Sequence, residues 1–217
     1  GNKGYMNWAQ IKEVESKSFA YIGNHSHSHD YLTKFNFGKF VEDIEESIKI
    51  FNDKLGYNPS FFSYPFGEYN LEQKNYISNN FEFAFGQHSG VIDLNKDKYE
   101  LPRFPINEKY GELRRFKEMI TYLPLQYKNI KPENKFMNVN ENPPKMTIEF
   151  FKDQKNLNNI NCFSNEGSKW RKTNIVIDNN ILKVKFAEKF VERRGRINCS
   201  LKSNRGWKFA GFQFVQN

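Results

Sequence analysis

The stretch Phe19-Ala20-Tyr21-Ile22-Gly23-Asn24-His25-Ser26-His27-Ser28-His29 places three of the four histidines at alternating positions, directly after a short apolar run. Neutral imidazole is the commonest protein ligand for zinc and similar ions. Imidazoles at the end of a strand can point toward one ion, so the stretch predicts a metal site. The His-x-His pattern alone is equally compatible with a surface turn. The surrounding sequence has to separate these two interpretations.

Helix and strand patterns alternate regularly around the histidines. Asn7 and Gln10 form a capping-box pattern, Gly56 stands where a second helix should end, and the acidic run 42–46 suits the first turns of that helix. Such alternation implies an α/β fold, with a parallel sheet or barrel and helices outside it. The expected helices span residues 7–17, 40–55 and 70–78, and the expected strands lie at 19–22, 61–64 and 81–85.

Three groups of polar or turn residues follow three of these expected strands. They are His25, the turn Tyr64-Pro65-Phe66-Gly67, and the pair Gln87-His88. In parallel α/β folds the active site forms at the carboxyl ends of the strands. We therefore expect the three groups to converge, which is better support for a site than the histidine spacing alone.

Charge divides the chain unevenly. The net charge of the 217 residues is +8; residues 1–150 hold 19 basic and 20 acidic residues (19 − 20 = −1), and residues 151–217 hold 14 and 5 (14 − 5 = +9). A basic region of this kind can attract acidic glycan, nucleic acid or an anionic surface, although a merely solvated basic face has the same composition.

The pattern also changes along the chain after a predicted helix at 113–123. Residues 124–145 are rich in Pro, Asn and Lys and are expected to form a linker. Short strands joined by Asn/Gly turns are expected in 146–217, a small all-β module. Cys162 and Cys199 lie in this module, where they could form one disulfide or remain two buried thiols.

No apolar stretch approaches the length of a membrane span, and the first residues show no signal-peptide pattern. The chain does not begin with Met, so we expect it to be processed or truncated. An extracytoplasmic or cell-envelope location is favoured over the cytoplasm, and the oligomeric state does not follow from the sequence.

The motif order resembles the polysaccharide deacetylases, bacterial carbohydrate esterases that remove acetyl groups from glycans with a divalent metal. The resemblance rests on His25-Ser26-His27-Ser28-His29, on Phe62-Ser63-Tyr64-Pro65-Phe66-Gly67-Glu68-Tyr69, and on the segments 85–90 and 101–105. The turn is similar to the variant found in deacetylases of poly-N-acetylglucosamine type. The resemblance implies a partial (β/α) barrel over residues 1–123 and removal of acetyl groups, chiefly N-acetyl, from a glycan substrate.

The resemblance also implies roles for individual residues. His25 and His29 correspond to metal ligands, with zinc as the favoured ion, because a bound metal activates water and polarises a carbonyl group. Tyr64 would line the sugar pocket, and the backbone N–H near Phe66 would face the oxyanion. His88 is a candidate general acid.

Other residues have weaker assignments. Arg103 is a candidate for orienting a catalytic group or the substrate, with surface ion pairing as the competing interpretation. Asp30, next to His29, would be a poor substitute for a third metal ligand. Trp170 and Trp207, interleaved with basic residues, could stack on sugar rings, or belong to a β core.

One departure from the family pattern concerns catalysis. The family's first motif, Thr-Phe-Asp-Asp-Gly, supplies the catalytic base and the third ligand, and no Asp-Asp pair occurs in this sequence. We expect the motif to lie upstream of residue 1, which would leave the isolated chain inactive or nearly so. The alternative is a non-catalytic carbohydrate-binding or scaffold relative that has lost the pair. Nucleic acid is not a favoured partner, because no recognised reading motif accompanies the basic charge.

Overall fold

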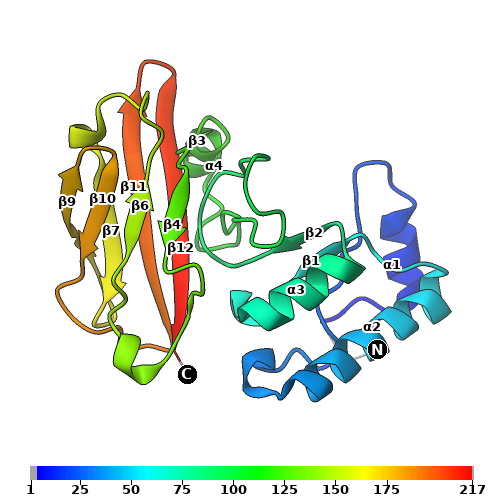
Figure 1. Cartoon of the computed structure of the whole chain (residues 1–217). Helices are drawn as coiled ribbons and strands as arrows, with labels where there is room; N and C mark the ends of the chain where they lie inside the picture. Colours follow the sequence, from blue (N-terminus) through cyan, green and yellow to red (C-terminus); the bar gives the residue numbers. More distant parts are fainter. Residues whose placement is uncertain (1–3, 217) are drawn as a thin grey trace. The chain divides into compact units, whose positions relative to one another are not determined.

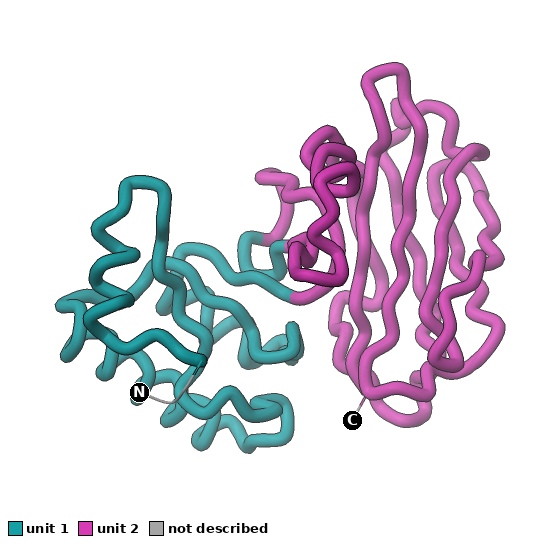
Figure 2. Tube along the Cα trace, turned by 180° about the vertical axis from the view of Figure 1, so that it is seen from behind, with its two compact units in different colours: residues 1–86, 98–101 teal, residues 87–97, 102–217 magenta. Residues whose placement is uncertain are grey.

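The computed structural model describes residues 4–216, which divide into two units. The N-terminal unit contains the residues up to Gly86 together with Lys98–Leu101. The C-terminal unit contains Gln87–Asp97 and the residues from Pro102 onward, as Figure 2 shows. The expected division lay instead at a linker after residue 123.

The N-terminal unit alternates helices with short parallel strands (Figure 1). β1 and β2 pair in parallel, with Phe61 opposite Phe83, and isolated parallel bridges join Asn24 to Phe62 and Phe85 to Leu101. The elements in chain order are α1 (Trp8–Glu15), η1 (Leu32–Lys34), α2 (Phe37–Leu55), β1 (Phe61–Ser63), η2 (Pro65–Gly67), α3 (Leu71–Asn80) and β2 (Phe83–Phe85). The mixed α/β character agrees with the sequence, but the described residues show no closed barrel.

Local capping explains where the helices begin and end. Asn7 and Asn70 cap α1 and α3 with complete capping boxes, and Gly56 ends α2 in the left-handed conformation, with φ of 85°. α2 begins at Phe37, earlier than expected, because Asn36 accepts the N–H of Lys39 and caps the helix. The acidic run 42–46 therefore lies beyond the first turn.

The core of this unit is largely aromatic. It is formed by side chains from β1, β2, the turn after β1 and the three segments packed on them: Leu32, Phe40, Ile44, Phe62, Tyr64, Tyr69, Ile77, Phe81 and Ala84. The expected buried strand at 19–22 was wrong. Phe19 and Tyr21 are 83% and 80% exposed. Within the described residues this segment joins β1 only at its far end, through the bridge from Asn24 to Phe62, so residues 19–22 do not form a strand of the sheet.

The C-terminal unit contains helix α4 (Leu113–Met119) and two β-sheets. One sheet has the order β3-β12-β11-β7-β8, with β5 also pairing with β12, and the other has the order β4-β6-β10-β9. The strands are β3 (Leu123–Pro124), β4 (Asn129–Lys131), β5 (Phe136–Met137), β6 (Thr147–Glu149), β7 (Asn161–Glu166), β8 (Lys169–Lys172), β9 (Asn174–Asp178), β10 (Ile181–Lys185), β11 (Arg194–Ser203) and β12 (Gly206–Gln216). Short 3-10 helices η3 (Val139–Glu141) and η4 (Leu157–Asn159) lie between strands.

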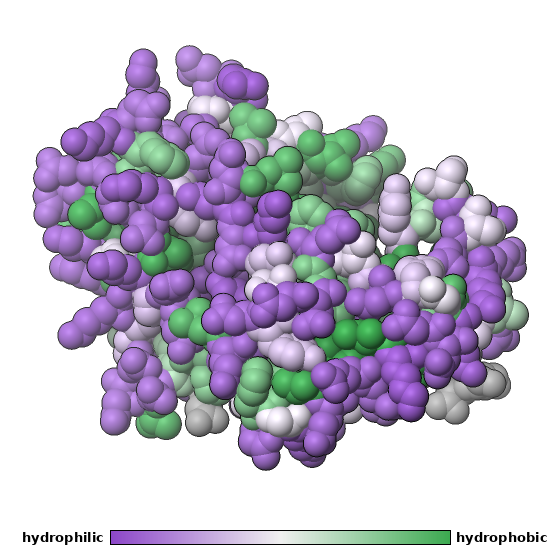
Figure 3. Space-filling model, turned by 45° about the vertical axis from the view of Figure 1, so that its right-hand side comes forward, coloured by the Kyte–Doolittle hydropathy of each residue, from purple (hydrophilic) through white to green (hydrophobic). Residues whose placement is uncertain are grey.

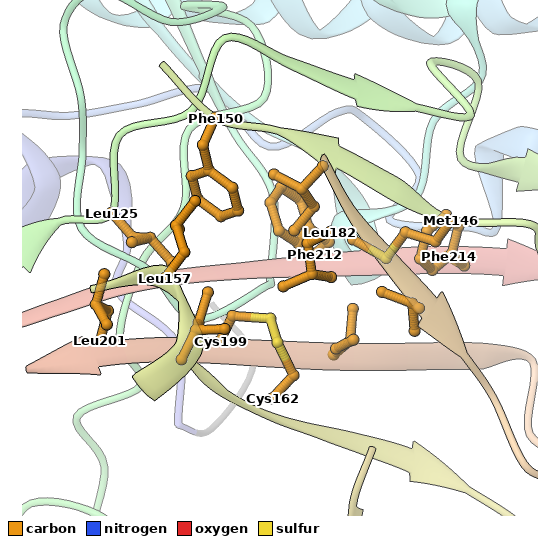
Figure 4. Close-up of a cluster of buried hydrophobic side chains, with 14 of the residues drawn as sticks. Leu125, Met146, Phe150, Leu157, Cys162, Leu182, Cys199, Leu201, Phe212 and Phe214 are labelled. Carbon is orange, nitrogen blue, oxygen red and sulfur yellow. A yellow bond between two sulfur atoms is a disulfide. The ribbon is translucent and has the colours of Figure 1, made fainter. Parts of the chain in front are cut away.

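Side chains from both sheets share one core in this unit. Figure 4 shows Phe150 and Leu182 in the same buried cluster as Phe212, Phe214 and the disulfide. Cys162 and Cys199 stand directly opposite each other on β7 and β11 and form that disulfide. The structure thus selects the disulfide from the two interpretations that the sequence left open.

The region expected to be a linker carries secondary structure. β3, β4 and β5 all lie within or at the edge of 124–145, and each pairs with a strand more than a dozen residues away. Pro and Asn punctuate the segment locally, but these long-range pairings determine its conformation. None of the helices within residues 4–216 combines the length and apolar character that crossing a membrane requires.

Candidate active site

A buried asparagine, Asn24, anchors the histidine-bearing loop to helix α2. Asn24 is 1% exposed, and its Nδ2 donates to the Ser47 hydroxyl of α2 at 3.0 Å. Its Oδ1 accepts the Ser26 N–H at 3.0 Å, so the same side chain joins the loop to the helix. Because buried amides are costly unless they are hydrogen-bonded, Asn24 specifies one loop conformation.

A carboxylate from α2 holds the middle of the loop. Asp43 accepts the N–H of His27 through Oδ1 and that of Ser28 through Oδ2, each at 3.0 Å. The acidic run 42–46 predicted an interaction of Asp43 with the helix dipole, but α2 has no acidic residue in its first turn. The bond to a neighbouring loop is a tertiary interaction that helical spacing cannot reveal.

Left-handed backbone at two positions turns the loop back on itself. Ser26 has φ of 68° and His29 has φ of 56°. The Ser26 hydroxyl accepts the His29 N–H at 3.0 Å, which stabilises this uncommon conformation. As a result the rings of His25 and His29 are neighbours, with centroids 4.8 Å apart; His25 is partly buried, and both His27 and His29 are exposed.

The end of β1 orients the His25 ring. Its Nδ1 lies 2.5 Å from the main-chain carbonyl oxygen of Ser63. A carbonyl oxygen can only accept, so Nδ1 carries a proton, and in the neutral ring Nε2 is then the nitrogen with a lone pair. Metal-binding histidines are commonly fixed in this way, by donating from the other ring nitrogen to a carbonyl group.

The histidine pair fits a shared metal ion. Two imidazoles bound to one ion at the usual metal–nitrogen distance have ring centres roughly 5 Å apart, close to the arrangement of His25 and His29. No group of three or more His, Cys, Asp or Glu side chains suited to a metal occurs among residues 4–216. The described residues therefore bring two imidazoles together but form no cluster of three candidate ligands.

The turn after β1 lies beside the histidines. Phe66 adopts a left-handed conformation, with φ of 58° and ψ of 5°, inside η2. Its ring is 4.9 Å from that of His29 and stacks on Tyr31 at 4.2 Å. The structure thus brings together three of the predicted residues, His25, His29 and Phe66, at the carboxyl end of the short parallel strands.

Tyr64 has a different environment from Phe66. Its side chain is 1% exposed and packs on Phe62 and Tyr69, with centroids 5.2 and 4.5 Å away. This placement supports a packing role beneath the turn, and the expected contact with a sugar stays a prediction.

A buried carboxylate behind the turn was missed by the sequence analysis. Glu68 is 2% exposed, and Thr33 donates to its Oε2 at 3.2 Å. The only available signal was its position directly after Gly67 in the family-like turn. Asn24 and Ser47 were also missed, because a single polar side chain next to an apolar run gives no sign of burial.

His88 and Arg103 belong to the C-terminal unit. The Arg103 N–H donates to the His88 carbonyl oxygen at 3.0 Å, so the two segments are joined through their backbones. His88 is partly buried and the Arg103 side chain is exposed. Their participation in one site with His25 and His29 stays a prediction.

Comparison with known protein families bears on the N-terminal part of the chain. Residues 1–83 match the polysaccharide deacetylase family model. The matched segment contains His25, His29 and Phe66, and it confirms the family resemblance that these motifs indicated. No curated protein matches the chain. The polysaccharide deacetylase match implies a hydrolase of the carbohydrate esterase type, with acetyl groups of a polysaccharide as its target.

Proposed function

We propose that this chain contributes to the metal-dependent hydrolysis of N-acetyl groups on a polysaccharide. The observation that carries the proposal is the pairing of His25 with His29, in which Ser63 directs the His25 ring. The family match over residues 1–83 supports the acetylated glycan as substrate.

The two histidines are the proposed metal ligands, and zinc is the favoured ion. A divalent ion held there supplies an activated water and polarises the acetyl carbonyl group. The loop contacts made by Asp43 and Asn24 keep the two rings in place, so that little reorganisation is needed when a ligand binds.

The remaining predicted residues have separate parts in this proposal. Hydrolysis forms a bond from water oxygen to the carbonyl carbon and breaks the carbon–nitrogen bond, with a proton delivered to the departing amine. His88 delivers that proton, and Arg103 orients the substrate or a catalytic group. The Phe66 backbone N–H stabilises the negative oxygen of the tetrahedral intermediate, and Tyr64 supports the turn that carries it.

The third ligand and the general base are not supplied by a three-residue cluster within residues 4–216. We propose that a carboxylate outside the described residues completes the site. A binding protein that keeps the histidine loop but lacks the carboxylate is the alternative, and it predicts glycan binding without acetate release.

We also propose that the protein works in an oxidising, extracytoplasmic compartment. The supporting observation is the Cys162–Cys199 disulfide, a bond that persists outside the reducing cytosol.

Calorimetric titration with zinc tests the metal assignment directly. His25→Ala and His29→Ala together should abolish saturable binding, while His27→Ala, on the same loop but outside the proposed ligand pair, should bind as the unaltered chain does. Equal zinc affinity in the double variant would overturn the histidine pair. Acetate release from an N-acetylglucosamine oligomer, measured with and without a chelator, then separates the esterase from the binding protein.

A further inference from the structure

The outward face of the sheet formed by β11, β7 and β8 carries an unusual set of side chains. Residues on alternate positions of a strand share a face, as do residues directly opposite each other on neighbouring strands. Cys162, Ser164 and Glu166 of β7 are all fully buried on the inner side, where the core of Figure 4 lies. The other residues of β7 therefore face outward.

Two aromatic rings stand on this outward face. Phe163 is 45% exposed and Trp170 is 50% exposed. Phe163 lies opposite Lys172, and Trp170 lies opposite Asn165, so the two rings occupy diagonal positions on adjacent strands. Single exposed aromatic residues are common on proteins, but two on adjacent strands form a platform on which a flat ligand can rest.

Amide side chains surround these rings. Asn198 of β11 lies directly opposite Phe163, and the outward positions of β7 on either side of Phe163 are also asparagines. Each amide offers both a donor and an acceptor, which suits hydroxyl and acetamido groups. We call this surface the amide–aromatic face; it comprises Asn161, Phe163, Asn165, Trp170, Lys172 and Asn198.

The amide–aromatic face continues toward the loop that carries His88. Gly211 of β12 lies opposite Asn198, and a Cβ there would clash with the carbonyl oxygen of Ser89, the residue after His88. Four residues in one row, Gly211, Asn198, Phe163 and Lys172, thus cross four strands, a distance of about 14 Å at the usual strand spacing.

The charge of this face favours a neutral ligand. Among its six residues Lys172 is the one cation and none is acidic. Arg196, two positions before Asn198 on β11, shares this side of the sheet, but it is partly buried and its Nε donates to Gln213. Proteins that bind single-stranded nucleic acid combine stacking rings with several cations for the phosphates. In this unit Lys202, Arg205 and Lys208 lie around the β11–β12 turn. Lys169 and Arg171 flank Trp170 along β8, but they lie opposite the inner positions of β7, and Arg171 pairs with Glu188. The surface of the protein is otherwise mainly hydrophilic with scattered apolar patches, as Figure 3 shows for one side.

We propose that the amide–aromatic face binds a segment of neutral, acetylated glycan and leads it toward the loop of His88. Phe163 and Trp170 stack on the sugar rings, and the asparagine amides bond to hydroxyl and acetamido groups. This inference rests on the proposed function for the identity of the glycan, but the binding itself requires neither a metal nor hydrolysis.

The test measures binding of an N-acetylglucosamine oligomer to the whole chain by NMR titration in the presence of a chelator. Amide resonances of residues 161–172 and of Asn198 should shift on addition of the oligomer. The double variant Phe163→Ala and Trp170→Ala should bind at least about tenfold more weakly, the equivalent of one or more good contacts. Phe151→Ala is the matched control, since Phe151 is also 45% exposed but follows β6 of the other sheet, and it should bind normally.

Further variants keep the outcomes distinct. Asn165→Ala and Asn198→Ala should weaken binding even if the aromatic double variant is poorly folded, as judged by thermal unfolding. The His25→Ala and His29→Ala variant should bind the oligomer normally, so loss of the proposed metal site does not mimic loss of this one. The proposal would be overturned if the unaltered chain did not bind the oligomer, or if all variants of the amide–aromatic face bound it as the unaltered chain does. It would also be overturned if a single-stranded oligonucleotide bound more strongly, in a salt-sensitive manner, and shifted the same resonances.

Discussion

His25 and Ser63 are joined by a short contact between the Nδ1 atom and the main-chain carbonyl oxygen, 2.5 Å apart. The contact connects the histidine loop to the end of β1, so the ring orientation depends on the strand rather than on the loop alone. Because the partner is a backbone atom, the orientation is insensitive to the side chain at position 63. Substitution of Ser63 by Ala should therefore leave the His25 ring in place.

The contact predicts a single tautomer for His25. NMR of isotopically labelled imidazole nitrogens should show the proton on Nδ1 when the ring is neutral, because the carbonyl group can only accept. The exposed His27 serves as an internal reference and should show the mixture typical of a solvated ring. A proton on Nε2 of His25 would contradict both the contact and its proposed role in metal binding.

Asp43→Ala should lower zinc affinity without removing a ligand. The carboxylate holds the N–H groups of His27 and Ser28, and loss of such supporting contacts commonly reduces metal affinity by about 10- to 100-fold. Calorimetric titration measures the change. Asp53→Ala, at an exposed position of the same helix, is the control and should have no effect.

Gly211→Ala should destabilise the C-terminal unit by about 1–3 kcal/mol, the usual cost of overpacking. The added Cβ would clash with the Ser89 carbonyl oxygen and with Asn198, and both neighbours are held by the sheet or its adjoining loop. Gly38→Ala should have the opposite effect on stability. Gly38 lies in α2, and a Cβ there would lie 3.6 Å from the Asn36 Oδ1 atom, which is an ordinary van der Waals contact. That change should stabilise the protein by up to about 1 kcal/mol, and denaturant unfolding of both variants checks the two signs.

Removal of the disulfide by Cys162→Ala and Cys199→Ala should lower the free energy of unfolding of the C-terminal unit by about 4 kcal/mol. The value follows from the 37-residue separation of the two cysteines in the loop-entropy estimate. Urea unfolding with and without a reductant measures it. A reductant that leaves the stability of the unaltered chain unchanged would contradict the prediction.

Tyr57 should titrate above the ordinary tyrosine pKa of about 10. Burial, followed by a hydrogen bond and charge repulsion from Glu15 of α1, raises the pKa of Tyr57 to about 12. A folded-state pKa above the unfolded value means that this contact contributes its stability below about pH 10, and the contribution is lost as the pH rises toward 12. Ultraviolet difference spectra of the unaltered chain and of Tyr57→Phe identify the transition, and Glu15→Gln should lower its midpoint.

Local sequence determined the parts of the fold that depend on nearest neighbours. Asn7 and Asn70 determine where their helices begin. In each case the side-chain oxygen accepts the free N–H of the residue three positions later, and this interaction requires no contact with distant segments. Most of the succession of helices and strands, and the turn at Phe66, were predictable in the same way, whereas the metal-ligand role of His25 and His29 stays a prediction. The family match over residues 1–83 confirms the resemblance that these motifs carried.

Only the tertiary structure decided the contacts between segments distant in sequence. Asp43 holds the histidine loop and Asn24 is buried beneath it, although both residues look like ordinary solvated polar residues in the sequence. The run at 19–22 is exposed because burial needs a partner surface, which apolar composition cannot guarantee. Pairing register likewise placed Phe163 and Trp170 on one face and joined Cys162 to Cys199, since the side of a sheet on which a residue lies depends on its neighbouring strands.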